Sequence, residues 1–423
     1  MREMKDSRIS WIGDLPSAWA TIPIKYNFTL VAGATPDSHN PDLWDGDVNW
    51  ITPADFKTED VYVKEGSRKL SEIGFKSCST SMIPAGSIIF SKRAPIGTVA
   101  INTTELCTNQ GCLGLVKKSR GLDNKYYYYI LSIYPEVFNI FGSGTTFKEI
   151  SATAFGEVSL PFPPVNEQHR ISSFLDSKCS EIDALTADIQ SQIDTLEQYK
   201  RSVITEAVTR GLDKNVEMKE SGIEWAEQIP AHWRTMHNKY LMHKVKEICP
   251  VYNGEDILSL TMQGVIVRDF ELGGKMPASF DGYQIIHPGN LLMCLFDYDV
   301  TPRCIGYINN EGLTSPAYSQ FVMEPIADAH YYYYYYLMLD FTKELLHLAK
   351  NLRHSFTEEQ LGEINTVVPP VNEQREIAGY LDKKVAIIDE AISLKNDQLS
   401  TLDAYKKSII YEYVTGKKEV PSV

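Results

Sequence analysis

Few residues of this chain have the types and the spacing that metal binding requires. The seven cysteines show no C-x-x-C spacing and no accompanying histidine pair; they are Cys78, Cys107, Cys112, Cys179, Cys249, Cys294 and Cys304. Structural zinc and a disulfide framework depend on such spacing. We therefore interpret the cysteines as reduced, mostly buried thiols and expect no metal site.

The stretch FGSG at 141–144 is the nearest approach to a cofactor-binding loop, because glycine-rich loops hold S-adenosylmethionine in methyltransferases. It follows an aromatic helical stretch rather than a strand, and the sequence has no Asn/Asp-Pro-Pro-Tyr/Phe motif for a target base. The phosphate loop G-x-x-x-x-G-K-[S/T] and the hydrolase motifs H-E-x-x-H and G-x-S-x-G are also absent from the sequence. These observations predict no catalytic activity and no cofactor.

Two tyrosine-rich stretches could bind bases by stacking: KYYYYILSIYPEVFNIF at 125–141 and HYYYYYYLMLDFTKELLHLA at 330–349. Aromatic side chains serve as such platforms in proteins that bind single-stranded nucleic acid. However, the continuous runs at 126–129 and 331–336 occupy every face of a helix. We therefore favour packing into a core over base stacking.

An internal repeat organises the elements around these residues. PPVNEQHRISSFLDSKCSEID at 163–183 aligns with PPVNEQREIAGYLDKKVAIID at 369–389 at an offset of 206, and about 22 of the 47 positions from 163 to 209 are identical. A weaker repeat relates 4–26 to 218–240. The chain is thus two copies of one plan, each with a short Trp/Pro entry, a variable block and a long repeated segment.

The repeated segments are predicted to be long helices. A Pro-Pro pair precedes each, and apart from Gly379 neither Pro nor Gly follows until Gly211 and Gly416. Apolar residues recur with heptad spacing, which predicts that the two helices pair as a coiled coil. In the first helix one core position holds Leu175, Ile182, Ile189, Leu196 and Val203, and the other holds Ile171, Lys178, Leu185, Gln192, Tyr199 and Glu206.

The variable blocks, roughly 21–155 and 235–360, are predicted to be α/β. Each has strand-like runs broken by Gly and Pro, SIIFSKRAPIGTVAI at 87–101 and NLLMCLFDYDVTPRCIGYI at 290–308, followed by the aromatic helical stretch. At 423 residues the chain has room for two to four domains. Its polar first residues and the lack of an apolar run of about 20 residues predict a cytoplasmic protein without a membrane span.

This pattern resembles the specificity subunits of type I restriction–modification systems. The paired PPVNEQ-plus-helix segments at 163–211 and 369–416 carry the resemblance most strongly. GATPDSHNPDLWDGDVNWITPADF at 33–56 is similar to the first-block signature of that family. PAGSIIFSKRAPIG at 84–97 and HPGNLLMCLF at 287–296 are each similar to its Pro-Gly-strand element.

The second block departs from that first-block signature. It reads LSLTMQGVIVRDFE at 258–271, where the first block has its GxTP…W…W stretch. No residue role is therefore transferred from one block to the other, and the two blocks are expected to read different DNA sequences.

The resemblance implies a fold and a division of the chain. The fold is α/β (α+β), with two globular target recognition domains separated by a long antiparallel two-helix coiled-coil spacer and related by a pseudo-two-fold repeat. The implied segments are target recognition domain 1 at 1–160, spacer helix 1 at 161–217, target recognition domain 2 at 218–366 and spacer helix 2 at 367–423.

The resemblance also implies a non-catalytic role in phage defence. The chain would bind a bipartite, asymmetric site in double-stranded DNA and direct adenine methylation or restriction. Two methyltransferase subunits and motor-nuclease subunits would perform the chemistry. A reader that serves a methyltransferase without a nuclease is equally compatible with the sequence. An alternative of another class is a coiled-coil scaffold that holds protein partners without sequence-specific DNA binding.

The net charge of −14 is unfavourable for a protein that binds DNA, because phosphates are neutralised by Lys and Arg. Residues 21–155 carry 13 basic and 13 acidic groups, whereas residues 235–360 carry 9 basic and 15 acidic groups. Partners are therefore expected to supply much of the positive field.

Side chains that favour phosphates and base edges mark the expected DNA contacts in each block. In the first block these are Lys92, Arg93, Ser143, Thr145, Thr146 and Lys148. In the second they are Arg268, Lys275, Arg303, Arg353 and His354.

Overall fold

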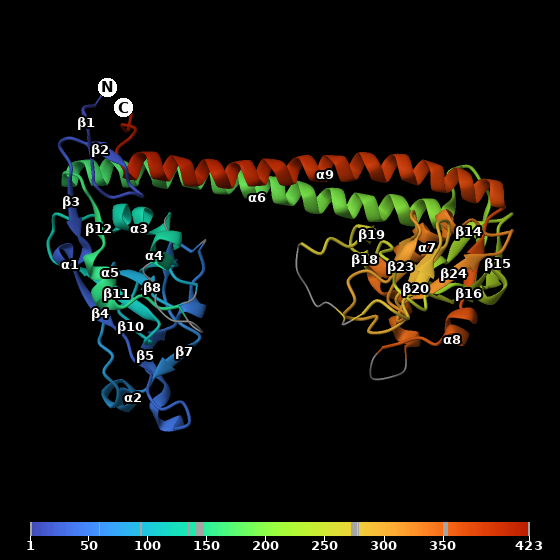
Figure 1. The fold of residues 1–423 in the computed structure, drawn as a ribbon, viewed down its shortest axis with the longest axis horizontal. Coiled ribbons are helices and arrows are strands. Elements are labelled where there is room, and N and C mark those ends of the chain that lie inside the picture. The colour runs from blue at the N-terminus through green and yellow to red at the C-terminus, as the bar shows by residue number, and fades with distance from the viewer. Residues whose placement is uncertain are drawn as a thin grey trace. The chain divides into compact units, whose positions relative to one another are not determined.

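The computed structural model divides the chain into two compact units. It describes residues 2–58, 60–93, 95–133, 135–140, 148–271, 277, 279–349 and 354–421. Unit 1 comprises Met1–Ile189 and Asp397–Val423, and unit 2 comprises Gln190–Asn396 (Figure 1). Each unit therefore holds one variable block with one half of each of the two long helices. No helix of the described residues is long and apolar enough to span a bilayer.

Unit 1 is built on a five-stranded sheet with the order β4-β11-β8-β9-β6, in which only the β6–β9 pair is parallel. Every residue of β8 and β9 is buried, because the sheet is covered on both faces. The strands are β4 (Phe28–Ala32), β6 (Tyr62–Val63), β8 (Ile88–Ser91), β9 (Val99–Asn102) and β11 (Cys112–Lys117).

A three-stranded sheet, β10-β5-β7, adds a second layer to unit 1. Trp44 and Trp50, both in β5, pack edge to face with ring centroids 5.1 Å apart, and the Arg68 guanidinium lies 3.7 Å from the Trp44 ring centroid. The strands are β5 (Trp44–Ile51), β7 (Arg68–Leu70) and β10 (Cys107–Thr108).

Short strand pairs and helices complete unit 1. The two strand pairs are β1 (Met4–Asp6) with β2 (Asp14–Pro16) and β3 (Ala20–Pro23) with β12 (Ser159–Phe162). The short helices are α1 (Ile24–Asn27), η1 (Pro41–Leu43), η2 (Pro53–Asp55), α2 (Glu72–Ser77), α3 (Asn124–Ser132), α4 (Pro135–Ile140) and α5 (Ala152–Glu157).

Unit 2 repeats the central sheet with one strand fewer, in the antiparallel order β16-β24-β21-β22. These strands are β16 (Met242–Val245), β21 (Leu291–Met293), β22 (Ile305–Tyr307) and β24 (Ser319–Met323). Beside it lie a three-stranded sheet and a hairpin: β17 (Glu247–Ile248), β20 (Gln284–Ile286) and β23 (Gly312–Thr314), then β18 (Leu258–Thr261) with β19 (Gly264–Val267).

The other elements of unit 2 are helices and edge strands. The helices are η3 (Glu224–Ala226), η4 (Asn238–Tyr240), α7 (Ala329–Thr342), η5 (Glu344–Leu348) and α8 (Glu358–Gly362). Two strand pairs close the unit: β13 (Met218–Glu220) with β14 (Gln228–Pro230), and β15 (Arg234–His237) with β25 (Asn365–Val368).

The turn that enters the central sheet has the same geometry in both units. Gly86 before β8 and Gly289 before β21 adopt φ angles of +79° and +88°, a region that glycine enters without steric cost. Gly86 N donates to Asn102 O at 2.7 Å, and Gly289 N donates to Ile308 O at 2.9 Å. The shared ground plan of the two variable blocks is thereby confirmed.

The long helices are α6 (Val165–Arg210) and α9 (Val371–Val414), and within each unit their segments run antiparallel side by side (Figure 1). Lys406 pairs with Asp183 at 2.5 Å in unit 1, and Lys200 pairs with Asp389 at 2.6 Å in unit 2. The expected fold class, α/β blocks with long antiparallel helices, is thus confirmed.

The heptad positions of α6 were only partly correct. Leu175, Ile182 and Val203 are buried, but Leu185 and Tyr199 of the second predicted core position are exposed. The buried isoleucines recur instead every eleven residues; they are Ile171, Ile182, Ile193 and Ile204. A repeat of eleven residues over three turns matches a nearly straight α-helix better than a repeat of seven over two turns. The buried positions of α6 therefore do not follow the heptad along its whole length.

Candidate nucleic-acid interface

Lys92 and Arg93 lie directly after β8, and one carboxylate binds both. Lys92 Nζ donates to Glu149 Oε1 at 2.6 Å, and Arg93 Nε donates to Glu149 Oε2 at 2.7 Å. Burial alone raises the pKa of Glu149, but the hydrogen bonds from the two cations outweigh it and hold that pKa below its usual range. Much of the positive charge at this loop is therefore compensated within the unit.

The same contact joins two segments of the chain. Arg93 and Glu149 form an antiparallel backbone bridge, and Ile150 N donates to Lys92 O at 3.0 Å. Lys148, next to this bridge, is exposed. The structure thus brings Lys92, Arg93 and Lys148 of the expected contacts together, whereas Ser143, Thr145 and Thr146 lie outside the described residues.

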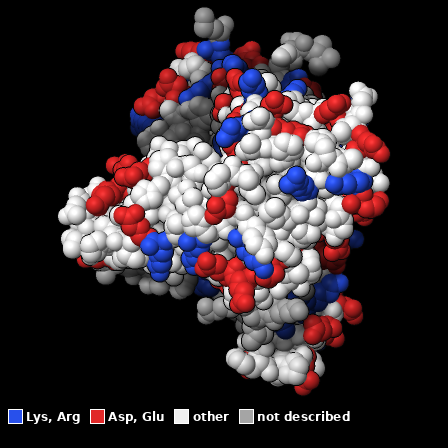
Figure 2. Space-filling model, turned by 90° about the vertical axis from the view of Figure 1, so that its right-hand side faces the viewer, with Lys and Arg blue, Asp and Glu red and all other residues white. Residues whose placement is uncertain are grey.

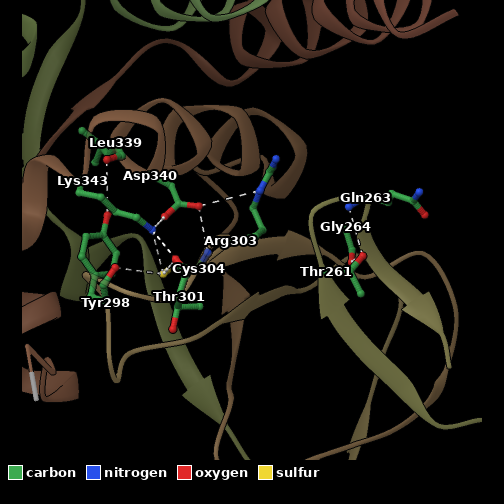
Figure 3. A network of polar contacts seen from close by, with 10 residues as sticks. All are labelled: Thr261, Gln263, Gly264, Tyr298, Thr301, Arg303, Cys304, Leu339, Asp340 and Lys343. Atoms are coloured by element: carbon green, nitrogen blue, oxygen red, sulfur yellow. Dashed lines mark hydrogen bonds and ion pairs between the residues drawn. The ribbon is translucent and has the colours of Figure 1, made fainter. Parts of the chain in front are cut away.

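In unit 2 the equivalent loop runs from β21 to β22 and ends at Arg303. The Arg303 side chain is only 11% exposed, and its Nε lies 3.9 Å from Oδ2 of the buried Asp340 in α7 (Figure 3). In this conformation the guanidinium serves a contact inside the unit. Its role in DNA binding stays a prediction.

His354 borders the same loop. Its Nδ1 lies 2.9 Å from Asp299 Oδ2, and its backbone carbonyl accepts a hydrogen bond from Tyr298 N at 3.2 Å. The hydrogen bond from His354 lowers the pKa of Asp299. His354 and Arg303 are therefore brought together by one loop, while Lys275 and Arg353 lie outside the described residues.

Arg268 belongs to a different element, the end of the β18–β19 hairpin. Its guanidinium lies 5.8 Å from the Phe270 ring centroid, and its backbone N donates to Ile257 O at 2.7 Å. The expected contacts of unit 2 thus come from two places, the hairpin and the β21–β22 loop.

Three residues of these clusters escaped the sequence analysis: Glu149, Asp340 and Lys343. Lys343 Nζ binds Asp340 Oδ1 at 2.6 Å with the i,i+3 spacing of neighbours on a helix, which is a signal the sequence does contain. Glu149 gives no such signal, because its partner Lys92 is 57 residues away along the chain.

The tyrosine stretches form the cores of both units, as the sequence favoured. Tyr126–Tyr129 and five of the six residues 331–336 are buried. Tyr126 OH donates to Val414 O at 2.7 Å, and Tyr331 OH donates to Val208 O at 2.8 Å, so each aromatic helix bonds the C-terminal end of a long helix. Buried side chains of this kind offer no platform for stacking bases.

The glutamine of the repeated PPVNEQ motif makes two equivalent hydrogen bonds in both units. Gln168 Oε1 accepts from Asp123 N, the N-cap of α3, at 2.9 Å, while its Nε2 donates to Pro163 O at 2.9 Å. Gln374 makes the same two bonds in unit 2, to Asp328 N at 2.6 Å and Pro369 O at 2.8 Å. Each long helix is thereby fastened to the aromatic helix of its own block.

The cysteines are free in the structure, and six of the seven are buried. Burial raises the pKa of Cys107 and of Cys179 to about 11, so these thiols remain protonated at neutral pH. In the described part of the chain, no group of three or more His, Cys, Asp or Glu side chains could hold a metal ion.

A hollow of about 600 Å³ in unit 2 does not suit phosphate. Its polar lining is dominated by Glu224, Glu359 and Glu363, which repel anions; apolar lining comes from Ile223, Trp225, Leu348 and Ile364. Figure 2 shows one face on which basic and acidic side chains alternate around a broad uncharged area. Electrostatics on this face would favour DNA only weakly.

The chain is similar in sequence to known proteins. Residues 16–195 match the family model for the type I restriction modification DNA specificity domain. The type I restriction enzyme MjaIX specificity subunit of Methanocaldococcus jannaschii is 34% identical over 190 residues, which are 44% of this chain and 43% of that protein. The MjaVIII specificity subunit of the same organism is 23% identical over 326 residues, 73% of each chain.

The chain thus spans less than half of the length of the more similar of these two relatives. A solved structure concerned with complex assembly and conformational transition of the type I R-M system covers 96% of this chain and 99% of its own, with a TM-score of 0.72 and 14% identity. That likeness shows the fold.

Proposed function

We propose that this chain is a type I restriction–modification specificity subunit, which reads a DNA sequence for partner subunits and is not itself an enzyme; the match of residues 16–195 to the DNA specificity domain of that family supports this. The observation that carries the proposal is the duplicated plan. The two units share the turn, the sheet order and the glutamine contact, yet they differ in the loops after β8 and β21. Constant scaffolds with different loops suit a protein that reads two different sequences.

Each unit would read one half of a bipartite, asymmetric site in double-stranded DNA. We assign target recognition to 1–160 and 218–366, and spacing to the helices within 161–217 and 367–423. Symmetric readers set the distance between half-sites by the distance between their reading elements. Here the length of α6 and α9 would set that distance.

The DNA contacts are proposed to come from the loops described above. Exposed Lys148 and the partly exposed Arg93 would reach phosphates in the first half-site. Arg268, His354 and Arg303 would act in the second. Lys92, Ser143, Thr145, Thr146, Lys275 and Arg353 remain candidates from the sequence.

The partners would be two methyltransferase subunits that modify adenine, with motor-nuclease subunits in a restricting complex in the cytoplasm. Exposed apolar side chains on the long helices support docking of partner helices; they are Leu185, Tyr199, Ile387 and Leu394. Partners that enclose the DNA would also supply the positive charge that unit 2 lacks.

A map of methylated adenines in the source genome, with this gene intact and deleted, tests the proposal. A split motif that loses methylation on deletion would establish the reader. Replacing 21–155 by another block should change one half of the motif only. An unchanged map, together with no motif on co-expression with a candidate methyltransferase, would leave the scaffold function instead.

A further inference from the structure

Asp340 is a buried carboxylate that the proposed function has not yet used. Its side chain is 3% exposed and lies in α7, within the network of Figure 3. Oδ2 accepts from Cys304 N at 2.9 Å, and Oδ1 accepts from Lys343 Nζ at 2.6 Å. A buried charge is unfavourable unless it is paired and hydrogen-bonded, and these partners meet that requirement.

The partners of this carboxylate either belong to the Tyr298–Cys304 loop or contact it. Lys343 Nζ also donates to Thr301 O at 2.7 Å and lies 4.7 Å from the centroid of the Tyr298 ring. Tyr298 OH points back to Leu339 O at 3.5 Å. Asp340 and Lys343 together therefore hold both ends and the middle of the loop against α7.

The opposite side of the loop faces solvent. Val300 is 72% exposed, and Asp297 before it adopts a φ of +48°, which turns the chain sharply. The tip carries the Asp299–His354 pair. A carboxylate can accept a hydrogen bond from the amino group of cytosine, and an imidazole N–H can donate to base or phosphate oxygens.

We infer that Asp340, acting with Lys343, is a positioning residue for DNA reading in unit 2. It fixes the Tyr298–Cys304 loop in one conformation, so that the tip with Asp299 and His354 meets the base edges of the second half-site. The inference rests on the proposed function and adds to it a residue that touches no DNA but decides how strictly one half-site is read.

Lys343→Gly tests this role, and the matched control below separates it from simple stability. Lys343 ends α7 with a φ of +54°, where glycine is the favoured residue, so the substitution removes the amine without weakening the end of the helix. The variant chain is expressed with its methyltransferase subunits in cells that lack the gene. The thermal midpoint and the genome-wide adenine methylation motif are then measured.

We expect an unchanged first half-site but a lower thermal midpoint, because Asp340 loses its charged partner and glycine at this φ angle offsets only part of that loss. At one or more positions of the second half-site, discrimination between the correct base and its alternatives should fall about tenfold, the scale of one base contact. Asp340→Asn should relax the same positions. A strict second half-site in both variants, or equal relaxation of both halves, overturns the inference.

Asp382→Asn is the matched control. Asp382 accepts from Tyr334 OH at 2.8 Å and lies 3.1 Å from His330 Nε2, so it supports the first turns of α7, whereas Asp340 and Lys343 lie at its C-terminal end. This variant should keep the wild-type motif; relaxation of the second half-site equal to that of Lys343→Gly would show a merely structural role. If the wild-type chain itself produces no motif, the proposed function fails and the inference with it, whereas a strict motif in the variants overturns the inference alone.

Discussion

In each unit one carboxylate from another segment holds the equivalent loop, but the surroundings of the two carboxylates differ. Glu149, which binds Lys92 and Arg93, is 31% exposed, whereas Asp340, which binds Lys343 and the loop before β22, is 3% exposed. Water can replace a partner at the first carboxylate but not at the second. The same task is therefore done by a surface ion pair in unit 1 and by a buried network in unit 2.

This difference teaches that burial, rather than the number of contacts, decides what each carboxylate contributes. Surface ion pairs contribute about 0–1 kcal/mol, while removing one partner of a buried pair costs about 3–5 kcal/mol. Unit 2, which is short of basic residues, thus relies on internal polar bonds to order its loop.

The largest expected effect is the loss of the buried carboxylate. Asp340→Ala leaves the Lys343 amine and the Cys304 N–H without this acceptor, so unit 2 should lose about 3–5 kcal/mol. Glu149→Ala should cost unit 1 about 0–1 kcal/mol. Hydrogen exchange resolved by peptide measures the two units separately, and equal losses would erase the contrast.

The next effect tests what the units share. Gln168→Ala and Gln374→Ala each remove a fully buried amide and leave an N–H and a carbonyl unsatisfied, at a cost of about 1–3 kcal/mol. Gln374 makes one bond more, from Nε2 to Ile326 O at 3.0 Å, so its loss should equal or exceed that of Gln168. Peptide-level hydrogen exchange at α3 and α7 measures the two losses, and a larger loss for Gln168→Ala would show that the duplicated scaffold is not equivalent.

A smaller effect concerns pH. The folded pKa of Glu149 is lowered, so its ion pairs stabilise unit 1 above the usual glutamate pKa of 4.5, and this contribution is lost as the pH falls through the folded value. Glu149→Gln should therefore reduce stability at pH 7 but converge with the wild type in acid. Unfolding curves from pH 7 to acid follow the difference, and a constant gap would contradict the ionic cause.

The smallest effect distinguishes phosphate contact from base reading in unit 1. Lys148 is exposed beside the Arg93–Glu149 bridge, so Lys148→Ala should reduce the slope of log binding constant against log salt by about 0.9. The methylation motif should stay the same. DNA binding by the complex at several salt concentrations measures the slope, and a changed first half-site would make Lys148 a base reader instead.

The sequence alone predicted the features that repeat or follow a period. The offset of 206 located α6 and α9, the Pro-Gly elements located the turns at Gly86 and Gly289, and the tyrosine runs were correctly placed in the core. These features depend on repeats and short motifs, which can be recognised within a single sequence.

The features that the sequence did not predict depend on contacts between residues that are far apart in the chain. Ile193 is buried and Leu185 is exposed, because the other long helix and the blocks determine which side of α6 is covered. The periodicity of the apolar residues does not contain that information. Asp340 accepts a hydrogen bond from Cys304 N, which is 36 residues away in the sequence. A contact over that separation leaves no pattern in the sequence, so the network was not predicted.

The bonds from the aromatic helices to the ends of the long helices have a consequence for synthesis. Tyr331 of unit 2 bonds Val208, which the ribosome has already made, whereas Tyr126 of unit 1 bonds Val414, which comes 288 residues later. Unit 2 has all of its chain, up to Asn396, before unit 1 receives Asp397–Val423. The block that is synthesised first is therefore completed last. Its apolar surface that packs against α9 stays exposed to solvent while the rest of the protein is synthesised.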